Sequence, residues 1–432
     1  MTDKTIATPQ TDGARVTGRA IMVLAIAGLV YVIAALERIS PPVVALDIRA
    51  ALGLGPDDLG LMFSATFIAY ALTQPIAGFG ADRFGPKRCL MMSAILIGLA
   101  SIMFAYSQSF WPAALARGLV GFAAGFAFVP AVRLSANWLP PRYLAMASTC
   151  ILAGSAFSNF LAGSPLARAA QAFGWRWAFM ALGLAAIALG ALVLFVVSDR
   201  PAKQASAAEA EPAKPSEVRF FAAAKLVLSH PMFWLMSMVY AGTDMLYDTY
   251  TGLWGGPYLM EAHLLSSVDA GNMLSVAAIG FLFGGPLLVL LGDRWGSYTK
   301  VLICLALGNV AITSFIIWGP ADAAPWMLYL LCLVAPLGVH GTGLLFAIGR
   351  GFFPENVTGT VIGFLNLMPF MAGALMQNII GRVLAAVQSD PATAGLSAHY
   401  HYGQAFKPVL FWCVLTVLAA FWLHRTRRGQ RI

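Results

Sequence analysis

Seven ionisable side chains lie inside long apolar stretches of the sequence, where a charge finds little water. They are Glu37, Arg38, Arg117, Arg133, Asp244, Asp248 and His340. A charge at the centre of a bilayer costs about 2.5–3.5 kcal/mol on insertion scales, so each of these residues is a functional candidate. An arginine offers a planar fork of donors to a carboxylate or phosphate, and a desolvated carboxyl group can hold a proton. These residue types therefore indicate anion binding and proton transfer.

The seventh apolar stretch carries a polar face. Asp244, Tyr247, Asp248 and Thr251 follow the i, i+3, i+4, i+7 spacing of one side of a helix. Such a face is not expected to contact lipid. We interpret it as the lining of a central cavity, with Tyr247 among the substrate-binding residues and Asp244 or Asp248 as a proton carrier. The alternative is that both carboxylates lie near an external mouth and are solvated.

Other polar residues in apolar stretches have two interpretations each. His340 stands between glycines, where it either packs or relays protons, and we include it among the candidate substrate-binding residues. Asn366 is a further candidate, although it and its neighbours Gln377 and Asn378 can equally join helices. Arg133 lies near the end of its stretch and is expected to snorkel towards the lipid headgroups.

The amino-acid composition indicates whether this chain lies in water or in a membrane. Of its 432 residues, 59% are hydrophobic and 11% are charged, whereas a soluble domain has about 25% charged residues. The mean hydropathy of +0.76 excludes a disordered chain, a disulfide scaffold and an ordinary cytosolic enzyme. The five cysteines fall in apolar stretches without CxxC spacing, so we expect neither a disulfide framework nor a metal site, and no cofactor. The composition predicts an integral membrane protein.

Twelve apolar stretches are long enough to cross a bilayer, which takes about 20 residues each in a helix. Helices are expected because each segment must pair its own backbone polar groups in hydrocarbon. The fold class is therefore an all-α membrane protein with twelve transmembrane helices. The stretches are 20–46, 58–78, 87–106, 110–136, 143–165, 176–197, 231–253, 267–291, 299–318, 326–349, 358–381 and 407–424.

The long polar segment in the middle divides the chain into two halves. Residues 198–229 are expected to form a cytoplasmic linker, because they include a run rich in Ala, Pro, Glu and Lys. The other predicted parts are a cytoplasmic tail over 1–19, six-helix bundles over 20–197 and 230–424, and a cytoplasmic tail over 425–432.

The positive charges predict the orientation. Of the 27 lysines and arginines, nineteen fall on the side that would hold both termini and the linker, five fall on the other side, and three lie within spans. The positive-inside rule therefore places both termini in the cytoplasm, in a multi-pass protein of a bacterial-type cell inner membrane. The net charge of +8 reflects these short basic segments, and it does not form a stripe that would suit nucleic acid.

A motif after the second stretch recurs after the eighth. Residues 78–88 read GFGADRFGPKR, and Asp82 and Arg83 recur as Asp293 and Arg294, an offset of 211 residues. The first copy resembles the G-x-x-x-D-R-x-G-x-[RK]-R signature of the major facilitator superfamily. The resemblance implies two six-helix pseudo-repeats, and it implies that these four residues act in gating. The basic residues alone would also serve as topology charges.

Two further segments extend the resemblance. Arg117-xxx-Gly121-xxx-Gly125 is similar to the second motif of the superfamily, in which the arginine influences proton movement or helix packing. The segment containing Glu37 and Arg38 resembles the first span of members that handle anions or dipeptides, where the arginine meets an anionic group of the substrate. Alternatively, Glu37 or Asp244 neutralises Arg38 as a gating pair. Adjacent helical residues project about 100° apart, so Glu37 and Arg38 are not expected to pair with each other.

These observations predict a secondary transporter that works by alternating access on a small anionic or zwitterionic solute. Proton symport is the hypothesis for its coupling, and facilitated diffusion is the alternative. Glu37, Arg117, Asp244 and Asp248 are the candidate coupling or gating residues within the spans. Its expected partners are the solute, the lipid bilayer and protons, without nucleic acid, and we expect a monomer. The alternatives are a multidrug or metabolite efflux antiporter and a metal-ion transporter of a specialised membrane. The fifth stretch lacks the G-x-x-x-G-P-x-x-G-G pattern of antiporters, which reduces the weight of drug efflux.

Overall fold

The computed structural model describes residues 17–201, 220–349, 352–354 and 357–429. Within these ranges every regular element is a helix, and none is a strand. Prolines at the first helical turn begin several of them, including α3, α4, α12 and α17. Proline suits this position because its missing N–H would have no partner there. The all-helical fold predicted from the sequence is confirmed.

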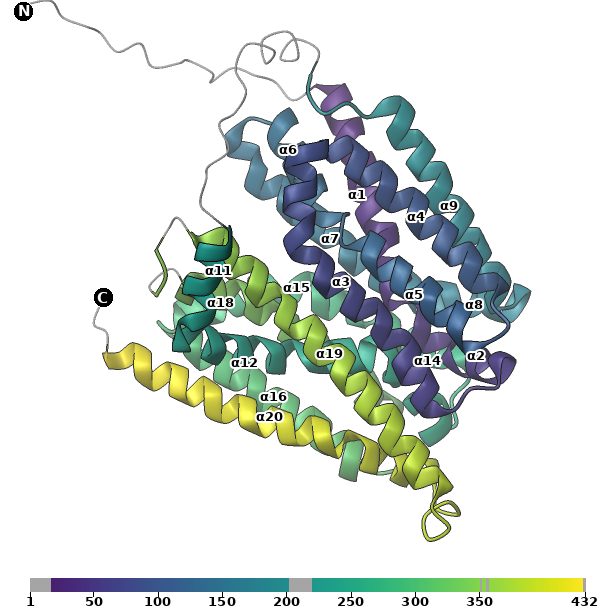
Figure 1. The fold of residues 1–432 in the computed structure, drawn as a ribbon. Coiled ribbons are helices and arrows are strands. Elements are labelled where there is room, and N and C mark those ends of the chain that lie inside the picture. The colour runs from purple at the N-terminus through teal and green to yellow at the C-terminus, as the bar shows by residue number, and fades with distance from the viewer. Residues whose placement is uncertain (1–16, 202–219, 350–351, 355–356, 430–432) are drawn as a thin grey trace, which may run out of the picture.

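The N-terminal half contains the elements drawn from purple to teal in Figure 1. They are α1 (Gly18–Ile39), η1 (Pro41–Val43), α2 (Ala45–Leu52), α3 (Pro56–Phe84), α4 (Pro86–Tyr106), α5 (Phe110–Ala124), α6 (Phe128–Trp138), η2 (Pro141–Tyr143), α7 (Leu144–Ala162), α8 (Ser164–Phe173) and α9 (Trp175–Val196).

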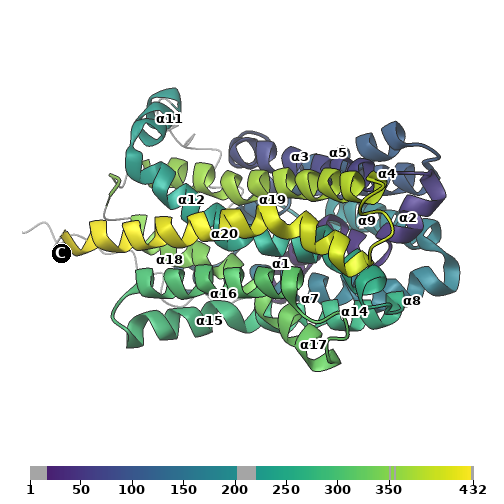
Figure 2. The same ribbon diagram turned by 90° about the horizontal axis from the view of Figure 1, so that it is seen from below.

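The C-terminal half follows, from teal to yellow, and in the view from below α20 runs along α12 and α16 (Figure 2). Its elements are α11 (Phe220–Ser229), α12 (Pro231–Leu246), η3 (Tyr247–Trp254), α13 (Gly255–Pro257), η4 (Tyr258–Ala262), α14 (Ser267–Ser275), α15 (Ala277–Arg294), α16 (Tyr298–Trp318), α17 (Pro325–Val334), η5 (Ala335–His340), α18 (Gly341–Gly349), α19 (Thr358–Ser389) and α20 (Ala398–Gly429).

Ten helical segments of the described chain are long and apolar enough to cross a membrane. The remaining two of the twelve predicted spans correspond to α3 and to the continuous helical run from α12 through η4. The end of the first span is a correction. It was expected at residue 46, but α1 ends at Ile39, because Pro41 and Pro42 supply no backbone donors to continue the helix. In addition, α11 occupies the end of the segment that was expected to be a linker.

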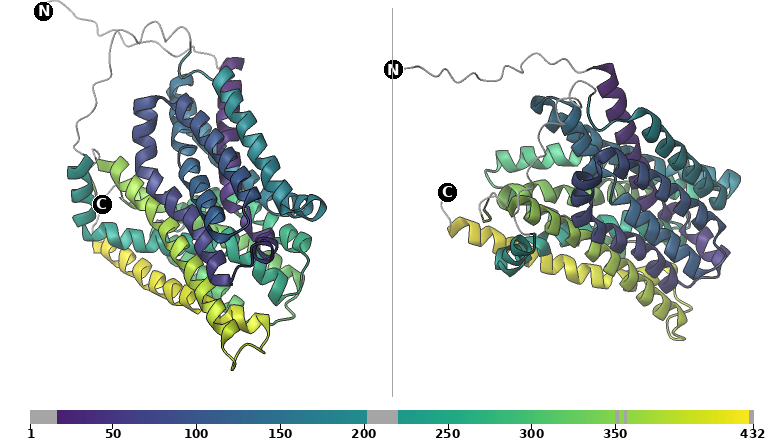
Figure 3. Two further views of the ribbon diagram at one scale, coloured as in Figure 1. Left: turned by 45° about the vertical axis from the view of Figure 1, so that its right-hand side comes forward. Right: turned by 45° about the horizontal axis from the view of Figure 1, so that its top comes forward.

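The two halves meet closely at one end of the molecule and diverge towards the other (Figures 1 and 3). We call the first the closed end. The start of α1 and the end of α20 lie towards the diverging end, which we call the terminal end.

Glycines make the close approach at the closed end possible. A Cβ atom on Gly256 would collide with the backbone carbonyl of Pro42, which belongs to the other half. A Cβ atom on Gly163 would lie 2.6 Å from the carbonyl oxygen of Gly271, and one on Gly60 would lie 2.6 Å from that of Gln377. Each contact joins the two halves backbone to backbone, so no side chain can yield to admit a larger residue.

An ion pair adds to the contacts at the closed end. Arg49 on α2 lies 3.3 Å from a carboxylate oxygen of Glu261 on η4. The other carboxylate oxygen of Glu261 accepts a hydrogen bond of 2.7 Å from the hydroxyl of Tyr402 on α20. Arg49 and Glu261 are both half-buried, so they hold the halves together with only modest electrostatic energy.

Candidate functional site

Arg38 lies near the end of α1, beside two aromatic rings that contact each other, one from each half. Its guanidinium carbon is 4.5 Å from the ring centre of Tyr70 on α3 and 5.0 Å from that of Phe370 on α19. The residue is 9% exposed, and its Nε and Nη1 atoms have no hydrogen-bond partner in the described part of the chain. Cation–π contacts stabilise the charge without using the N–H donors. The donors therefore remain available to an anion.

Asp244 and Asp248 belong to the helical run that faces Arg38 from the other half. They are 3% and 1% exposed, which is not the solvated environment considered as an alternative. One carboxylate oxygen of each, Oδ1 of Asp244 and Oδ2 of Asp248, is buried without a hydrogen-bond partner among the described residues. Neither carboxylate forms an ion pair with Arg38. The site therefore holds separated charges of both signs.

The helix that carries Asp248 is irregular at this point. From Tyr247 to Trp254 it is a π-helix, which widens the turn and shifts the side chains relative to an α-helix. Asp248 lies against α19, where a Cβ atom on Gly373 would be 3.1 Å from Asp248 Oδ2. The side-chain amide of Gln377 donates a hydrogen bond of 2.8 Å to the Asp248 carbonyl.

Polar side chains bridge the two halves beside the charged residues. The hydroxyl of Tyr247 donates a hydrogen bond of 3.0 Å to the side-chain oxygen of Asn159 on α7. The side chain of Asn366 lies 3.4 Å from that of Gln74 on α3, and it also accepts a 3.1 Å hydrogen bond from Tyr240. Tyr247 and Asn366 thus lie where the halves meet, whereas Asn159 and Gln74 were not identified from the sequence.

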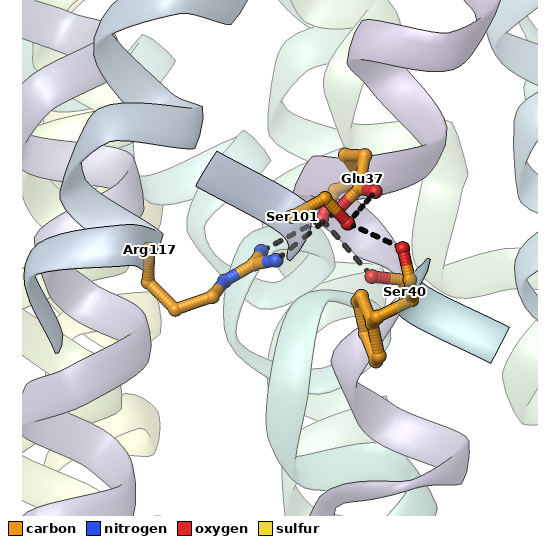
Figure 4. Close-up of polar contacts among 5 residues, drawn as sticks. Glu37, Ser40, Ser101 and Arg117 are labelled. Carbon is orange, nitrogen blue, oxygen red and sulfur yellow. Dashed lines mark hydrogen bonds and ion pairs between the residues drawn. The ribbon is translucent and has the colours of Figure 1, made fainter. Parts of the chain in front are cut away.

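Glu37 pairs with Arg117 inside the N-terminal half (Figure 4). Arg117 Nη1 lies 3.5 Å from a carboxylate oxygen of Glu37, and Nη2 donates a 2.7 Å hydrogen bond to the Glu37 carbonyl. Both side chains are 0% exposed. The hydroxyl of Ser101 lies 2.6 Å from the second carboxylate oxygen, and that of Ser40 donates to the Glu37 carbonyl over 3.0 Å. Glu37 is thus unavailable as the partner of Arg38.

His340 is half-buried at the end of η5, within the C-terminal half. Its ring packs against Gly284 and Gly285 of α15 and lies 5.1 Å from the ring of Phe281. Phe281 in turn lies 5.9 Å from the ring of Tyr247. Phe281 therefore lies between His340 and Tyr247, and the glycines provide the space that the His340 ring occupies.

The repeated loop motif lies at the terminal end. Arg83, Asp293 and Arg294 are exposed there, and Asp293 accepts a 2.8 Å hydrogen bond from the hydroxyl of Tyr298. The side chain of Asp82 lies outside the described residues. The structure adds Asp199, whose carboxylate accepts a 2.7 Å hydrogen bond from the backbone N–H of Lys87 at the start of α4. A carboxylate at a helix N-terminus is favoured by the helix dipole.

Gly85 has a φ of +84°, a backbone conformation that favours glycine. A Cβ atom at this position would lie 2.7 Å from the Asp199 carboxylate, so the missing side chain also lets Asp199 approach. Sequence analysis missed Asp199, and its position directly after the sixth apolar stretch is the only signal it gives.

Arg133 on α6 is exposed. No group of three or more potential metal ligands occurs among the described residues.

The arrangement of two pseudo-repeated helical halves around a charged interface agrees with a match of residues 23–377 to the family model described as Major Facilitator Superfamily. The chain belongs to the Major Facilitator Superfamily. It is therefore a membrane transport protein with the twelve-helix fold, and it is not an enzyme.

Curated relatives of this transporter carry the names of organic anions. It is 31% identical to a probable sulfoacetate transporter of Cupriavidus necator, over 42% of each chain. It is 24% identical to a putative tartrate transporter of Agrobacterium vitis, over 86% of this chain and 91% of the relative. It is 23% identical to a gentisate transporter of Corynebacterium glutamicum, over 87% and 81%.

A solved structure shares the fold. A bacterial homologue of the human lysosomal transporter Spinster, in an inward-facing and unoccupied conformation, superposes with a TM-score of 0.77 at 17% identity. The match covers 97% of this chain and 99% of the other. At this identity the likeness establishes the fold alone.

Proposed function

We propose that this protein is a secondary transporter of small anionic or zwitterionic organic solutes, and that Arg38 binds the anionic group of the solute. The observation that supports the proposal is the buried guanidinium of Arg38 between the halves, with Nε and Nη1 unpartnered among the described residues. A buried donor without a partner is unfavourable, and a carboxylate or sulfonate would satisfy two donors of the fork at once. The names of the relatives support the same solute class.

Alternating access would use the two halves as moving bodies, residues 20–197 and 230–424, linked through 198–229. We propose that the terminal end faces the cytoplasm of a bacterial-type inner membrane, because the sequence assigns nineteen of the 27 lysines and arginines to the side that holds both termini and the linker. The conformation in which the halves meet at the closed end and diverge at the terminal end would then be inward-facing. Tyr247, Asn366 and His340 would contribute to the solute site. Gating would involve the residues of the repeated loop motif, which are Asp82, Arg83, Asp293 and Arg294. We expect the protein to work as a monomer.

Replacing Arg38 by alanine is expected to reduce anion uptake about 10- to 100-fold, because hydrogen bonds to charged groups contribute about 1.5–3 kcal/mol. Arg38→Lys should recover only part of the loss, since lysine keeps the charge and lacks the planar fork. Uptake of labelled tartrate, gentisate and sulfoacetate into proteoliposomes measures this. Arg168→Ala, at an exposed position on α8, is the matched control. Full uptake by Arg38→Ala would contradict the proposal.

We further propose that Glu37 carries the coupling proton in symport. The hydroxyl of Ser101 lies 2.6 Å from the carboxylate of Glu37 and 2.9 Å from the carbonyl of Phe179, yet it has one proton to donate. When Glu37 is ionised, Ser101 can donate to it. When Glu37 is protonated, its hydroxyl can donate to Ser101, which then donates to Phe179. Both charge states of Glu37 therefore have a complete set of hydrogen bonds at this position.

Glu37→Gln should abolish the acceleration of uptake by an inward proton gradient while solute exchange between equilibrated compartments continues. Ser101→Ala should weaken the response to the gradient, and Ser101→Thr, which keeps the hydroxyl, should restore it. Paired measurements of gradient-driven uptake and of exchange in proteoliposomes separate these effects from a loss of solute binding. The proposal fails if Glu37→Gln still responds to the proton gradient as the parent does.

A further inference from the structure

The buried charge between the halves is divided by sign. Among the described residues, the buried lysines and arginines are Arg38 and Arg117, and both belong to the N-terminal half. Arg117 is already engaged by Glu37. The C-terminal half presents Asp244 and Asp248, with no buried lysine or arginine in its described part. A solute between the halves therefore meets one available guanidinium on one side and two carboxylates on the other.

Packing at α19 places these groups around the same space. Phe370 stacks on Arg38, and Gly373, one turn later on α19, lies against Asp248. Because Gly373 has no side chain, the Asp248 side chain lies directly against the surface of α19. Arg38 and the two aspartates nevertheless form no ion pair. Both sides keep buried atoms without a hydrogen-bond partner among the described residues, donors on Arg38 and acceptors on the aspartates.

A simple organic dianion does not fit this division. One of its anionic groups would bind Arg38, and the other would be left beside Asp244 or Asp248, where like charges in a water-poor site repel each other. A solute with an anionic group at one end and an ammonium group at the other would satisfy both sides. Buried charges are tolerated when they are paired and hydrogen-bonded, and a zwitterion provides both pairs together.

We propose that the preferred solute is a small zwitterion, with its carboxylate or sulfonate on Arg38 and its ammonium group on the Asp244 and Asp248 carboxylates. The inference rests on the proposed function, since it assigns the second half of the same site. It also assigns Asp248 as a specificity-determining residue, because Asp248 is the more deeply buried of the two aspartates and lies directly against α19.

Six probes of matched size test this inference. β-Alanine and taurine are zwitterions, malonate and sulfoacetate are dianions, and propionate and ethanesulfonate lack a second charged group. Binding to the purified full-length protein is measured by the concentration dependence of its thermal unfolding, because a ligand of the folded state raises the apparent stability. The zwitterions are expected to bind at least about tenfold more tightly than the dianions with the same anionic group.

Asp248→Asn is expected to remove this preference and to improve the binding of the dianions, while Asp322→Asn, an exposed change on the surface, leaves the order unchanged. Asp244→Asn provides a second variant if Asp248→Asn does not fold. Tighter binding of dianions in the parent, or an order unaffected by either aspartate variant, would overturn the inference. If anions of any class bind and Arg38→Ala abolishes that binding, the proposed function still stands. If Arg38→Ala has no effect, the proposed function fails as well.

Discussion

Replacing Arg117 by alanine is expected to lower the free energy of unfolding by about 3–5 kcal/mol, because the change leaves the Glu37 carboxylate buried without its cation. Arg117 and Glu37 are both 0% exposed, so water cannot replace the lost partner without opening the N-terminal half. The rings of Phe63 and Phe104 lie 5.2 and 5.4 Å from the guanidinium carbon and line the space that would be left. The thermal unfolding of detergent-purified protein measures the loss.

A double-mutant cycle distinguishes a lost charge partner from lost packing. Arg117→Met keeps most of the volume but leaves the Glu37 carboxylate without its cation, so it should be unstable by itself. Adding Glu37→Gln removes the unpaired charge and should recover most of the stability that Arg117→Met loses. The same double variant should still lack gradient-driven uptake, because it has no group to carry the proton. A double variant as unstable as Arg117→Met alone would show that the unpaired Glu37 carboxylate does not account for the effect.

Gly256→Val is expected to prevent the two halves from meeting at the closed end and to reduce transport about 100-fold. A Cβ atom at this position collides with the backbone carbonyl of Pro42, so relief requires separation of the halves and not rotation of a side chain. Overpacking typically costs about 1–3 kcal/mol, and the upper value corresponds to roughly 100-fold in an equilibrium. The halves are expected to meet at the closed end only when the terminal end is open. The Gly256→Val variant should therefore accumulate in the opposite conformation, with the halves separated at the closed end.

Accessibility measures the change in conformation independently of transport. Thr251→Cys lies beside a small void between the halves that is also lined by Pro42 and Asn159. In a background with Cys150 and Cys304 replaced by serine, a membrane-impermeant thiol reagent applied from outside should label this cysteine quickly in the Gly256→Val variant and slowly in its parent. Gly308→Val is the control, since a Cβ atom there meets nothing within 4 Å. Equal labelling rates in the Gly256→Val variant and its parent would contradict the role of the contact between Gly256 and Pro42 in holding the closed end together.

The sequence predicted most of the fold because the bilayer imposes a simple rule on it. Runs of apolar residues near the required length identify membrane helices almost directly, and a repeated loop motif reveals the duplication. The first helix ended early because two adjacent prolines interrupted an otherwise continuous apolar run. The π-helix after Leu246 could not be predicted, because a shift in hydrogen-bond register leaves no distinctive residue pattern.

The site was predicted in part. Arg38, Asp244 and Asp248 were recognisable because charged residues are rare in membrane spans. Their surroundings were not recognisable. Tyr70 and Phe370 are ordinary aromatic residues in apolar stretches, and only the rotation of α3 and α19 brings them onto the guanidinium.

The pairing of Glu37 with Arg117 shows the same limit. It joins α1 to α5, and Ser101 reaches the carboxylate from α4. Spacing along one helix predicts which residues share a face, but it does not predict which face of a neighbouring helix they meet.

The two aromatic rings beside Arg38 have a consequence for the affinity of the site on the two sides of the membrane. One ring belongs to each half, so the swing that exposes the site to the opposite compartment must pull Phe370 away from a guanidinium that Tyr70 still covers. The cation then sits in a wetter environment, where it attracts an anion less strongly. The two orientations of the carrier should therefore hold the same cargo with unequal strength. This built-in asymmetry, separate from any ion gradient, would bias how readily the cargo is released on each side.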